Sequence, residues 1–512
     1  MNPPPLVAVG ARRAGAGFVL DRAALAALPD ASKPGLVEQI FAAVQRAIRA
    51  RQLAEGARLP SLREVAANCG VSRDTAARAY DRLVAHGYLT TRRGAGFYVR
   101  AGAGNAAGTS GAEAPGSQRA PPAAAIRRGL PLPASIDWRQ RLLDPQVPLA
   151  SRLGAGELPA AWINTPAVAD AFRGVARGNL DWVHDHGEPQ GYLPLRAQIA
   201  LRLDALGIGT TPARIATTVG ATDALNLIVM AYLRTPGEPV LVDDPASYLL
   251  LDRLMASGLN AVPVPRDTDG PDPEALRDAC ERTGARMYIC NTGLHNPTSG
   301  GLSTHRAFRV LQLAERYDLT VVEDDCYADL LPAIGPLPQT RLAALDQLRR
   351  VIYVGSFSKT LGAGLRVGYI AADAERIAWL SRYKSVSRAS NGSLSERIVY
   401  RLLSEGAYRH HCEQLRARLD AARPLLRQAL DALGIEVAHR AEQGMYLWGR
   451  LPGAAPDASQ IATALLAQGH LCAPGAMFSH QREAAAFMRF NVASAGDVQA
   501  WRALAQALAG AA

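Results

Sequence analysis

The chain has 512 residues, of which 48% are hydrophobic and 20% charged, and 56 basic against 46 acidic side chains give a net charge of +10. This composition is typical of a folded protein of several domains and excludes a wholly disordered chain. The longest apolar runs, such as 225–233, are shorter than the roughly 20 residues that span a bilayer, and the N-terminus lacks the basic-then-apolar order of a signal peptide. We therefore expect a soluble, cytoplasmic protein with no membrane partner.

Cysteine and lysine usage limits the chemistry that this chain can perform. The six cysteines lie far apart without a C-x-x-C motif, so we expect neither a disulfide framework nor a metal site. Lysine is rare: of the 56 basic residues, three are Lys33, Lys359 and Lys384, and the remaining 53 are Arg. A reaction that needs a primary amine from a side chain therefore has three candidates.

Positive charge is concentrated near the N-terminus. Residues 1–33 are rich in Pro, Ala and Gly and are predicted to form an arm. Residues 34–100 carry eleven arginines and five acids, a net charge of +6, which leaves only +4 for the other 445 residues. So high a charge on so small a unit indicates contact with a polyanion.

Residues 34–100 have the pattern of three helices and a hairpin. Ser61 and Glu64 fit a capping box that begins a second helix, which Gly70 ends, and Ser72 can cap a third. Two β-type runs in 88–100 predict a hairpin. Apolar residues at four-residue spacing predict the first helix, at Leu36, Ile40, Val44 and Ile48. This order of elements is typical of a winged helix-turn-helix.

In a winged helix-turn-helix, the first turn of the third helix enters the major groove of DNA. That turn would present Ser72, Arg73, Asp74 and Thr75, while Arg63, Arg92 and Arg93 would reach phosphates. The alternative is a protein-interaction module whose arginines only solvate one face. The charge of +6 favours DNA.

The stretches LPSLREVA, GVSRDTAARAYDRLVAHGYL and RRGAGFYV resemble the GntR family of bacterial regulators across residues 34–100. That resemblance implies DNA contacts at Arg63, Arg73, Thr75 and Gly94. Asp74 stands where relatives often have a neutral polar residue.

Residues 101–133 are almost all Ala, Gly, Pro, Ser and Arg, which predicts a flexible linker. In residues 134–512, apolar β-type runs alternate with amphipathic helical runs. This alternation predicts an α/β fold with a largely parallel sheet. The strand candidates include 240–242, 287–290, 320–323, 351–354 and 367–370.

The sequence SFSKTLGAGLR directly follows the strand candidate 351–354. Its Lys359 can form a Schiff base if pyridoxal 5′-phosphate (PLP) supplies the carbonyl carbon. The hydroxyls of Ser356 and Ser358 and the guanidinium of Arg366 suit the phosphate of that cofactor. The positive charge of Arg366 is also expected to favour the neutral form of the Lys359 amine. Taken alone, the motif is equally consistent with a surface loop.

Three more motifs lie at strand ends or helix starts, where α/β folds bind ligands. Asp324 and Tyr327 follow the strand candidate 320–323 and can contact the pyridine nitrogen and the ring oxygen of PLP. Asn296, in NPTSG, can reach the same oxygen, and the start of a helix at 220–222 can hold phosphate. The alternatives are a helix N-cap for Asp324 and a plain Asn-Pro turn for Asn296.

Together these motifs resemble the fold-type I aminotransferases over nearly all of 134–512. The resemblance implies that Lys359 forms the internal aldimine, that Asp324 pairs with the pyridine nitrogen, and that Tyr327 and Asn296 bind the ring oxygen. It also implies phosphate contacts at Ala221, Thr222, Ser356, Ser358 and Arg366.

The same resemblance implies two further contacts. Tyr248, in DDPASY, would stack on the cofactor ring, and Arg489, in FMRFNVAS, would bind a substrate or effector carboxylate through its planar fork. The alternative for Arg489 is an ordinary surface residue. His186 stands where the family usually has a Tyr that reaches the phosphate of a neighbouring subunit.

A GntR-type winged helix (α+β), a linker, and a large α/β aminotransferase-like domain with a smaller C-terminal α+β subdomain resemble the MocR-type transcription regulators over about the whole chain. The resemblance implies a homodimer that binds a double-stranded DNA operator and carries PLP. Its effector would be PLP itself or a small amino compound that condenses with it. Two alternatives stay open: a catalytically active aminotransferase with a DNA-binding appendage, and an aminotransferase scaffold without bound cofactor.

Overall fold

The computed structural model describes residues 20–22, 25, 35–92, 96–101, 152–331, 340–438, 442–453 and 457–511. The chain divides into two compact units, Met1–Ile126 and Arg127–Ala512. Most of the predicted arm, the predicted linker beyond Ala101, and residues 134–151 lie outside the described residues. Within the described ranges, no helix is both long and apolar enough to cross a membrane.

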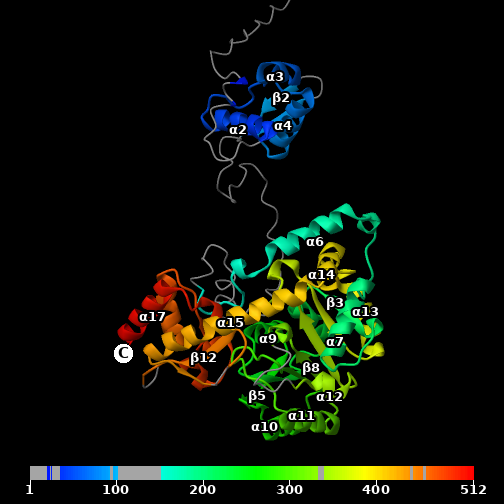
Figure 1. Cartoon of the computed structure of the whole chain (residues 1–512), viewed down its shortest axis with the longest axis vertical. Coiled ribbons are helices and arrows are strands. Elements are labelled where there is room, and N and C mark those ends of the chain that lie inside the picture. Colours follow the sequence, from blue (N-terminus) through cyan, green and yellow to red (C-terminus); the bar gives the residue numbers. More distant parts are fainter. Residues whose placement is uncertain are drawn as a thin grey trace, which may run out of the picture. The chain divides into compact units, whose positions relative to one another are not determined.

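The smaller unit has the predicted winged helix-turn-helix order (Figure 1). Both hydrogen bonds of the capping box are present, since the side chains of Ser61 and Glu64 each accept from the other's backbone N–H. Gly70 ends the second helix in the left-handed conformation (φ 65°), and Ser72 caps the third. The elements are α2 (Leu36–Arg49), α3 (Leu62–Cys69), α4 (Arg73–Ala85) and the antiparallel strands β1 (Leu89–Arg92) and β2 (Gly96–Val99).

One apolar core holds the smaller unit together. Ile40 and Val44 of α2, Tyr80 of α4 and other buried side chains meet in it. Leu20 and Leu25, two described residues of the segment predicted as an arm, are also buried there. Part of that segment therefore packs against the winged helix.

The larger unit is built on an eight-stranded sheet in the order β3-β10-β9-β8-β7-β4-β5-β6. Strands β9, β8, β7, β4 and β5 are parallel, and β10 and β6 pair antiparallel, which confirms the predicted mainly parallel sheet. The bounds are β3 (Ile215–Thr218), β4 (Pro239–Asp244), β5 (Asn260–Asp267), β6 (Gly270–Pro271), β7 (Met287–Asn291), β8 (Thr320–Asp324), β9 (Val351–Ser356) and β10 (Gly368–Ala371).

Helices cover both faces of this sheet because successive strand residues point to opposite sides. In β8, Val321 faces one apolar core and Val322 the other. The first core contains α6 (Thr165–Arg177), α7 (Leu193–Ala205), α10 (Pro273–Thr283), α11 (Thr304–Arg316), α12 (Leu342–Asp346) and α14 (Ser393–Ser404). The second contains α8 (Ala221–Tyr232), α9 (Tyr248–Ala256) and α13 (Ala374–Arg388).

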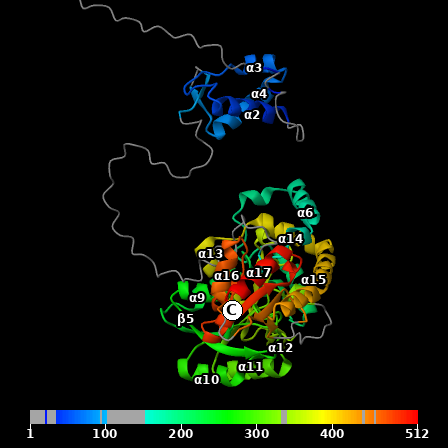
Figure 2. The same ribbon diagram turned by 90° about the vertical axis from the view of Figure 1, so that its left-hand side faces the viewer.

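A smaller antiparallel sheet follows in the chain, in the order β11-β12-β14-β13. Side chains of α15, α16 and α17 share one apolar core with this sheet, and Figure 2 shows this part of the unit from a second side. The bounds are α15 (Ala407–Ala432), β11 (Glu436–Val437), β12 (Tyr446–Arg450), α16 (Ala458–Ala467), β13 (Ala473–Pro474), β14 (Phe487–Asn491) and α17 (Val498–Ala511). This subdomain matches the predicted smaller C-terminal α+β part.

Candidate functional site

A cavity of about 330 Å³ opens at the carboxyl ends of β4, β7, β8 and β9. Parallel strands end at the same edge of a sheet, so residues far apart in the sequence meet there. All eleven residues predicted to bind the cofactor or an effector carboxylate line this cavity: Ala221, Thr222, Tyr248, Asn296, Asp324, Tyr327, Ser356, Ser358, Lys359, Arg366 and Arg489.

Lys359 lies in the loop after β9, and its Nζ donates to the backbone carbonyl of Gly156 (2.9 Å). Burial acts to lower the pKa of the Lys359 amine, but Tyr446 and Glu157 act in the opposite direction, and the pKa lies above its ordinary value. The expectation of a predominantly neutral Lys359 amine is therefore wrong. Arg366 is exposed and instead donates to the carbonyl of Val219 (2.9 Å).

Asp324 is the last residue of β8, and its side chain faces the cavity. Burial raises the pKa of its carboxyl group to about 6, although the Cys326 N–H, which donates to Oδ1 (3.2 Å), acts in the opposite direction. The helix N-cap alternative is not observed, because the helical turn that follows, Ala328–Leu330, has no side-chain cap. The carboxyl group is therefore free to meet a cation in the cavity.

The start of α8 offers a candidate anion-binding site. Gly220, at φ 82°, precedes the helix and provides no side-chain cap, so the first N–H groups of α8 are open to a ligand. Ser356 Oγ accepts from the backbone N–H of Ser358 (3.2 Å). The Ser358 hydroxyl is buried and has no hydrogen-bond partner in the described part of the chain. A buried hydroxyl left in this way fits a phosphate group that would accept from it.

Arg489, on β14, is 1% exposed, which excludes the surface alternative. Its guanidinium donates to Oδ1 of Asn296 (2.8 Å) and to the carbonyl of Gly154, and both acceptors are neutral. The rings of Tyr446 and Phe478 lie 4.3 and 4.8 Å from its central carbon. This buried cation is held in place by polar and aromatic groups, and no carboxylate of the described residues pairs with it.

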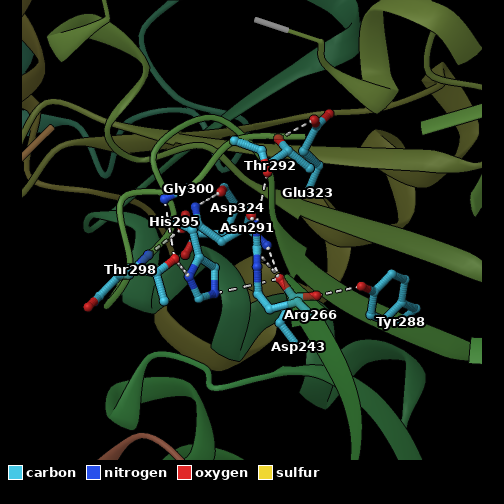
Figure 3. Close-up of polar contacts among 12 residues, drawn as sticks. Asp243, Arg266, Tyr288, Asn291, Thr292, His295, Thr298, Gly300, Glu323 and Asp324 are labelled. Atoms are coloured by element: carbon cyan, nitrogen blue, oxygen red, sulfur yellow. Dashed lines mark hydrogen bonds and ion pairs between the residues drawn. The ribbon is translucent and has the colours of Figure 1, made fainter. Parts of the chain in front are cut away.

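A buried polar network lies behind the strand ends (Figure 3). The ion pair of Asp243 with Arg266 (2.9 Å) lies at its centre, and His295 Nε2 is 3.8 Å from the Asp243 carboxylate. The Asn291 side chain donates to the carbonyl of Asp324 and accepts from the backbone N–H of Asn296 (2.8 Å). Asn291 therefore ties together two loops that carry predicted cofactor residues.

Several residues of the cavity wall were not predicted from the sequence. His295 adjoins the Asn-Pro motif, so its position next to Asn296 was a usable indication. Gly156, Glu157 and Tyr446 come from segments with no recognisable motif, and the fold alone brings them to Lys359. His186, by contrast, is exposed and is not part of this cavity wall.

The predicted DNA contacts that the structure describes lie at the surface of the smaller unit. Arg63 on α3 and Arg73 at the start of α4 are exposed. Ser72 Oγ accepts from the N–H of Thr75 (3.0 Å), so this pair also forms the helix cap. The Arg92 guanidinium lies over the ring of Tyr98 at 4.6 Å. Two further predicted contacts, Arg93 and Gly94, lie outside the described residues.

Comparisons with known proteins agree with this two-part organisation. Residues 151–508 match the family of class I and II aminotransferases, and residues 36–99 match the gntR family of bacterial regulatory proteins. The vitamin B6 salvage pathway transcriptional repressor PtsJ of Salmonella typhimurium is 30% identical over 78% of this chain and 82% of its own length. The probable rhizopine catabolism regulatory protein MocR of Rhizobium meliloti is 28% identical over 79% and 77%. The chain belongs to the MocR-type transcription regulators.

The larger unit of this MocR-type regulator has the fold of solved aminotransferases. LysN, the α-aminoadipate aminotransferase of Thermus thermophilus solved with N-(5′-phosphopyridoxyl)-L-leucine, is 26% identical, with a TM-score of 0.64 over 73% of this chain and 97% of its own. The predicted fold class is therefore confirmed. The chain is a GntR-type DNA-binding regulator joined to an aminotransferase-like unit.

Proposed function

We propose that this MocR-type regulator holds PLP in the cavity around Lys359, senses PLP or an amino compound that reacts with it, and changes its binding to operator DNA in response. The observation that carries the proposal is the meeting of all eleven predicted residues in one cavity. PtsJ, which resembles this chain over most of its length, is named for vitamin B6 salvage, and this supports a B6 compound as a ligand.

The residues present fit each part of the cofactor. The start of α8 and the unpartnered Ser358 hydroxyl suit the phosphate, and the Asp324 carboxylate suits a protonated ring nitrogen. When bound, PLP supplies an aldehyde carbon that a primary amine can attack, and Lys359 is the lysine of the cavity wall. Arg489 suits the carboxylate of an amino compound.

One segment offers a route from the cavity to the rest of the chain. Residues 152–157 lie near the N-terminal end of the larger unit, and two of their carbonyls accept from cavity side chains: Gly154 from Arg489, and Gly156 from Lys359. A ligand that binds Arg489 or Lys359 competes with these carbonyls for the hydrogen-bond donor. We propose that ligand binding changes how this N-terminal segment of the larger unit is held, and that the predicted linker passes the change on to the winged helix.

On the DNA side, the exposed first turn of α4 is the proposed reading element. Helix-turn-helix proteins usually bind palindromic operators as dimers, with two half-sites about one helical turn apart. We therefore propose a homodimer, with Arg63, Ser72, Arg73, Thr75, Arg92, Arg93 and Gly94 at the DNA.

A working aminotransferase is the second candidate, because the amine, the carboxylate and the carboxylate-binding guanidinium that transamination needs share one cavity. Incubation of the PLP-loaded protein with a panel of amino acids separates the two candidates. Release of keto acids over many turnovers supports an enzyme. A change of the cofactor spectrum without turnover supports a sensor.

The test of the proposal uses Lys359→Ala. We expect this variant to lose the borohydride-stable adduct and the effect of ligands on DNA binding, while basal DNA binding persists because the winged helix has its own core. Mass spectrometry locates the adduct unambiguously since the chain has three lysines. Lys384 is fully buried, donates to the Thr217 carbonyl (2.8 Å) and does not line the cavity. An adduct on Lys384 or Lys33 contradicts the proposal.

A further inference from the structure

Glu157 is an acidic side chain in the cavity wall to which the proposed function gives no role. It lines the same cavity as Lys359 and Arg489. Its backbone is fixed, because Nδ2 of Asn491 donates to the carbonyl of Glu157 (2.8 Å) and to that of Ala155 (2.9 Å). The carboxylate is therefore presented to the cavity by a segment that Asn491, at the end of β14, holds in place.

Among the described residues, one oxygen of the Glu157 carboxylate has no hydrogen-bond donor. Its Oε2 is buried and has no partner in the parts of the chain that the structure describes. Burying a carboxylate oxygen without a donor costs free energy, and a ligand that donates to it recovers that cost. The carboxylate also affects Lys359. Burial acts to lower the pKa of the Lys359 amine, but Tyr446 and Glu157 raise it.

The two cations of the cavity wall, Arg489 and Lys359, have different hydrogen-bond partners. Arg489 donates to two neutral oxygens, so its charge is open to a ligand carboxylate. Lys359 donates its hydrogen bond to the carbonyl of Gly156. The Glu157 carboxylate, which lines the same cavity, is therefore open to a positive group on a ligand.

We propose that the effector is an amino compound that carries a second positive charge, and that Glu157 selects it. This inference rests on the proposed function, because it assigns the substrate class of the same cavity. An amino acid with one carboxylate and a distal ammonium satisfies Arg489 and Glu157 together. A second carboxylate on the ligand would instead face a like charge, which disfavours acidic amino acids.

The experiment compares three amino acids on the full-length, PLP-loaded protein. L-Ornithine carries a distal ammonium, L-norleucine has a methyl group at the same chain position, and L-glutamate carries a second carboxylate. Affinities come from the change in cofactor absorbance and from calorimetry. We expect ornithine to bind at least about tenfold more tightly than norleucine, and glutamate to bind most weakly.

The variant Glu157→Gln keeps the shape of the side chain and removes its charge. It should bind ornithine about tenfold less tightly and leave norleucine nearly unchanged, while Glu483→Gln, an equal charge change at an exposed position, should alter neither. The ligand comparison on the unmodified chain stands even where the variant folds poorly.

The outcomes separate this inference from the proposed function. Bound PLP with equal affinity for ornithine and norleucine, or with a preference that Glu157→Gln leaves intact, overturns the role of Glu157 alone. Failure to trap any cofactor on Lys359 overturns the proposed function, and the inference falls with it. Bound cofactor with no response to any of the three amino acids also overturns the inference, and PLP itself is then the remaining effector.

Discussion

Two neighbouring carboxylates at the end of β8 have opposite surroundings. Asp325 is 1% exposed and pairs with Arg341 at 2.6 Å, and the Tyr353 hydroxyl donates to it (3.0 Å). Asp324 points to the cavity and accepts a single backbone hydrogen bond, from Cys326. The difference follows from the alternation of side chains along a strand. Only one of two chemically identical residues is left available to a ligand.

The first prediction concerns the pH dependence of Asp324. Burial raises its pKa from 3.8 to about 6, so the folded, cofactor-free protein binds this proton more tightly than the unfolded chain. Its contribution to stability is therefore full below pH 3.8 and is lost as the pH rises through 6. We expect cofactor-free Asp324→Asn to be more stable than the parent at pH 8, by on the order of 1–3 kcal/mol.

Thermal unfolding of the cofactor-free proteins between pH 4 and pH 8 measures this effect. The gain of Asp324→Asn should shrink toward pH 4, where the parent carboxyl group is itself neutral. Asp325→Asn is the matched control, and it should destabilise the protein because it removes the carboxylate that pairs with buried Arg341. Equal stability changes for Asp324→Asn at pH 4 and pH 8 would contradict the assignment.

The second prediction concerns Arg73, the first residue of α4. If its guanidinium reads a base edge, Arg73→Ala should weaken operator binding by roughly 1–3 kcal/mol and should weaken binding to random DNA less. Arg46→Ala, on exposed α2 surface, removes the same charge and should affect both DNAs equally and weakly. Fluorescence anisotropy at several salt concentrations measures both. Equal losses on the two DNAs for Arg73→Ala would show a phosphate contact instead.

At the scale of elements, the start of α8 is positioned by a residue with no side chain. Gly368 begins β10 and pairs with Thr218 at the end of β3, directly beside the turn that leads into α8. A Cβ at Gly368 would lie 2.6 Å from the carbonyl carbon of Gly220 and 2.9 Å from the backbone nitrogen of Ala221. The close approach of strand and helix start therefore requires glycine at this position.

The third prediction follows from that contact. Gly368→Ala should displace the first N–H groups of α8 and weaken PLP binding by about tenfold or more, because these groups are the proposed phosphate donors. Gly364→Ala is the matched control, since a Cβ there meets no atom within 4 Å. Absorbance titration with PLP measures both affinities. Parent-like affinity in Gly368→Ala would remove the α8 start from the phosphate site.

At the scale of the whole molecule, the two units have separate apolar cores. The winged helix packs around Val44 and Tyr80, and the larger unit packs on both faces of its sheet. No apolar cluster of the described residues combines side chains of the two units. Each unit is therefore expected to fold without the other.

The fourth prediction is that mild proteolysis cuts first within residues 101–133, whose composition predicts a flexible linker. Two stable fragments should result, and the smaller one should still bind DNA, with an affinity that falls steeply as salt rises. Mass spectrometry of the fragments locates the cuts. First cuts inside 34–100 or 190–380 would contradict the predicted domain boundaries.

Local sequence patterns predicted the elements of the winged helix and five strands of the large sheet, β4, β7, β8, β9 and β10. The capping box of Ser61 and Glu64, the stop at Gly70 and the cap at Ser72 all rest on hydrogen bonds within a few residues, so local sequence predicts them. The cavity motifs were also predictable from the sequence. Each one directly follows a strand or begins a helix, and the carboxyl ends of parallel strands lie at the same edge of the sheet.

The surroundings of those motifs depend on long-range packing. Glu157 and Tyr446 lie 202 and 87 residues from Lys359 in the chain, and no local pattern links them to it. The raised pKa of Lys359, opposite to the expectation from Arg366, comes from these distant groups, because electrostatic effects depend on distance in space and on burial. A residue type at a strand end can be predicted from sequence, but its charge environment depends on every segment that the fold packs against it.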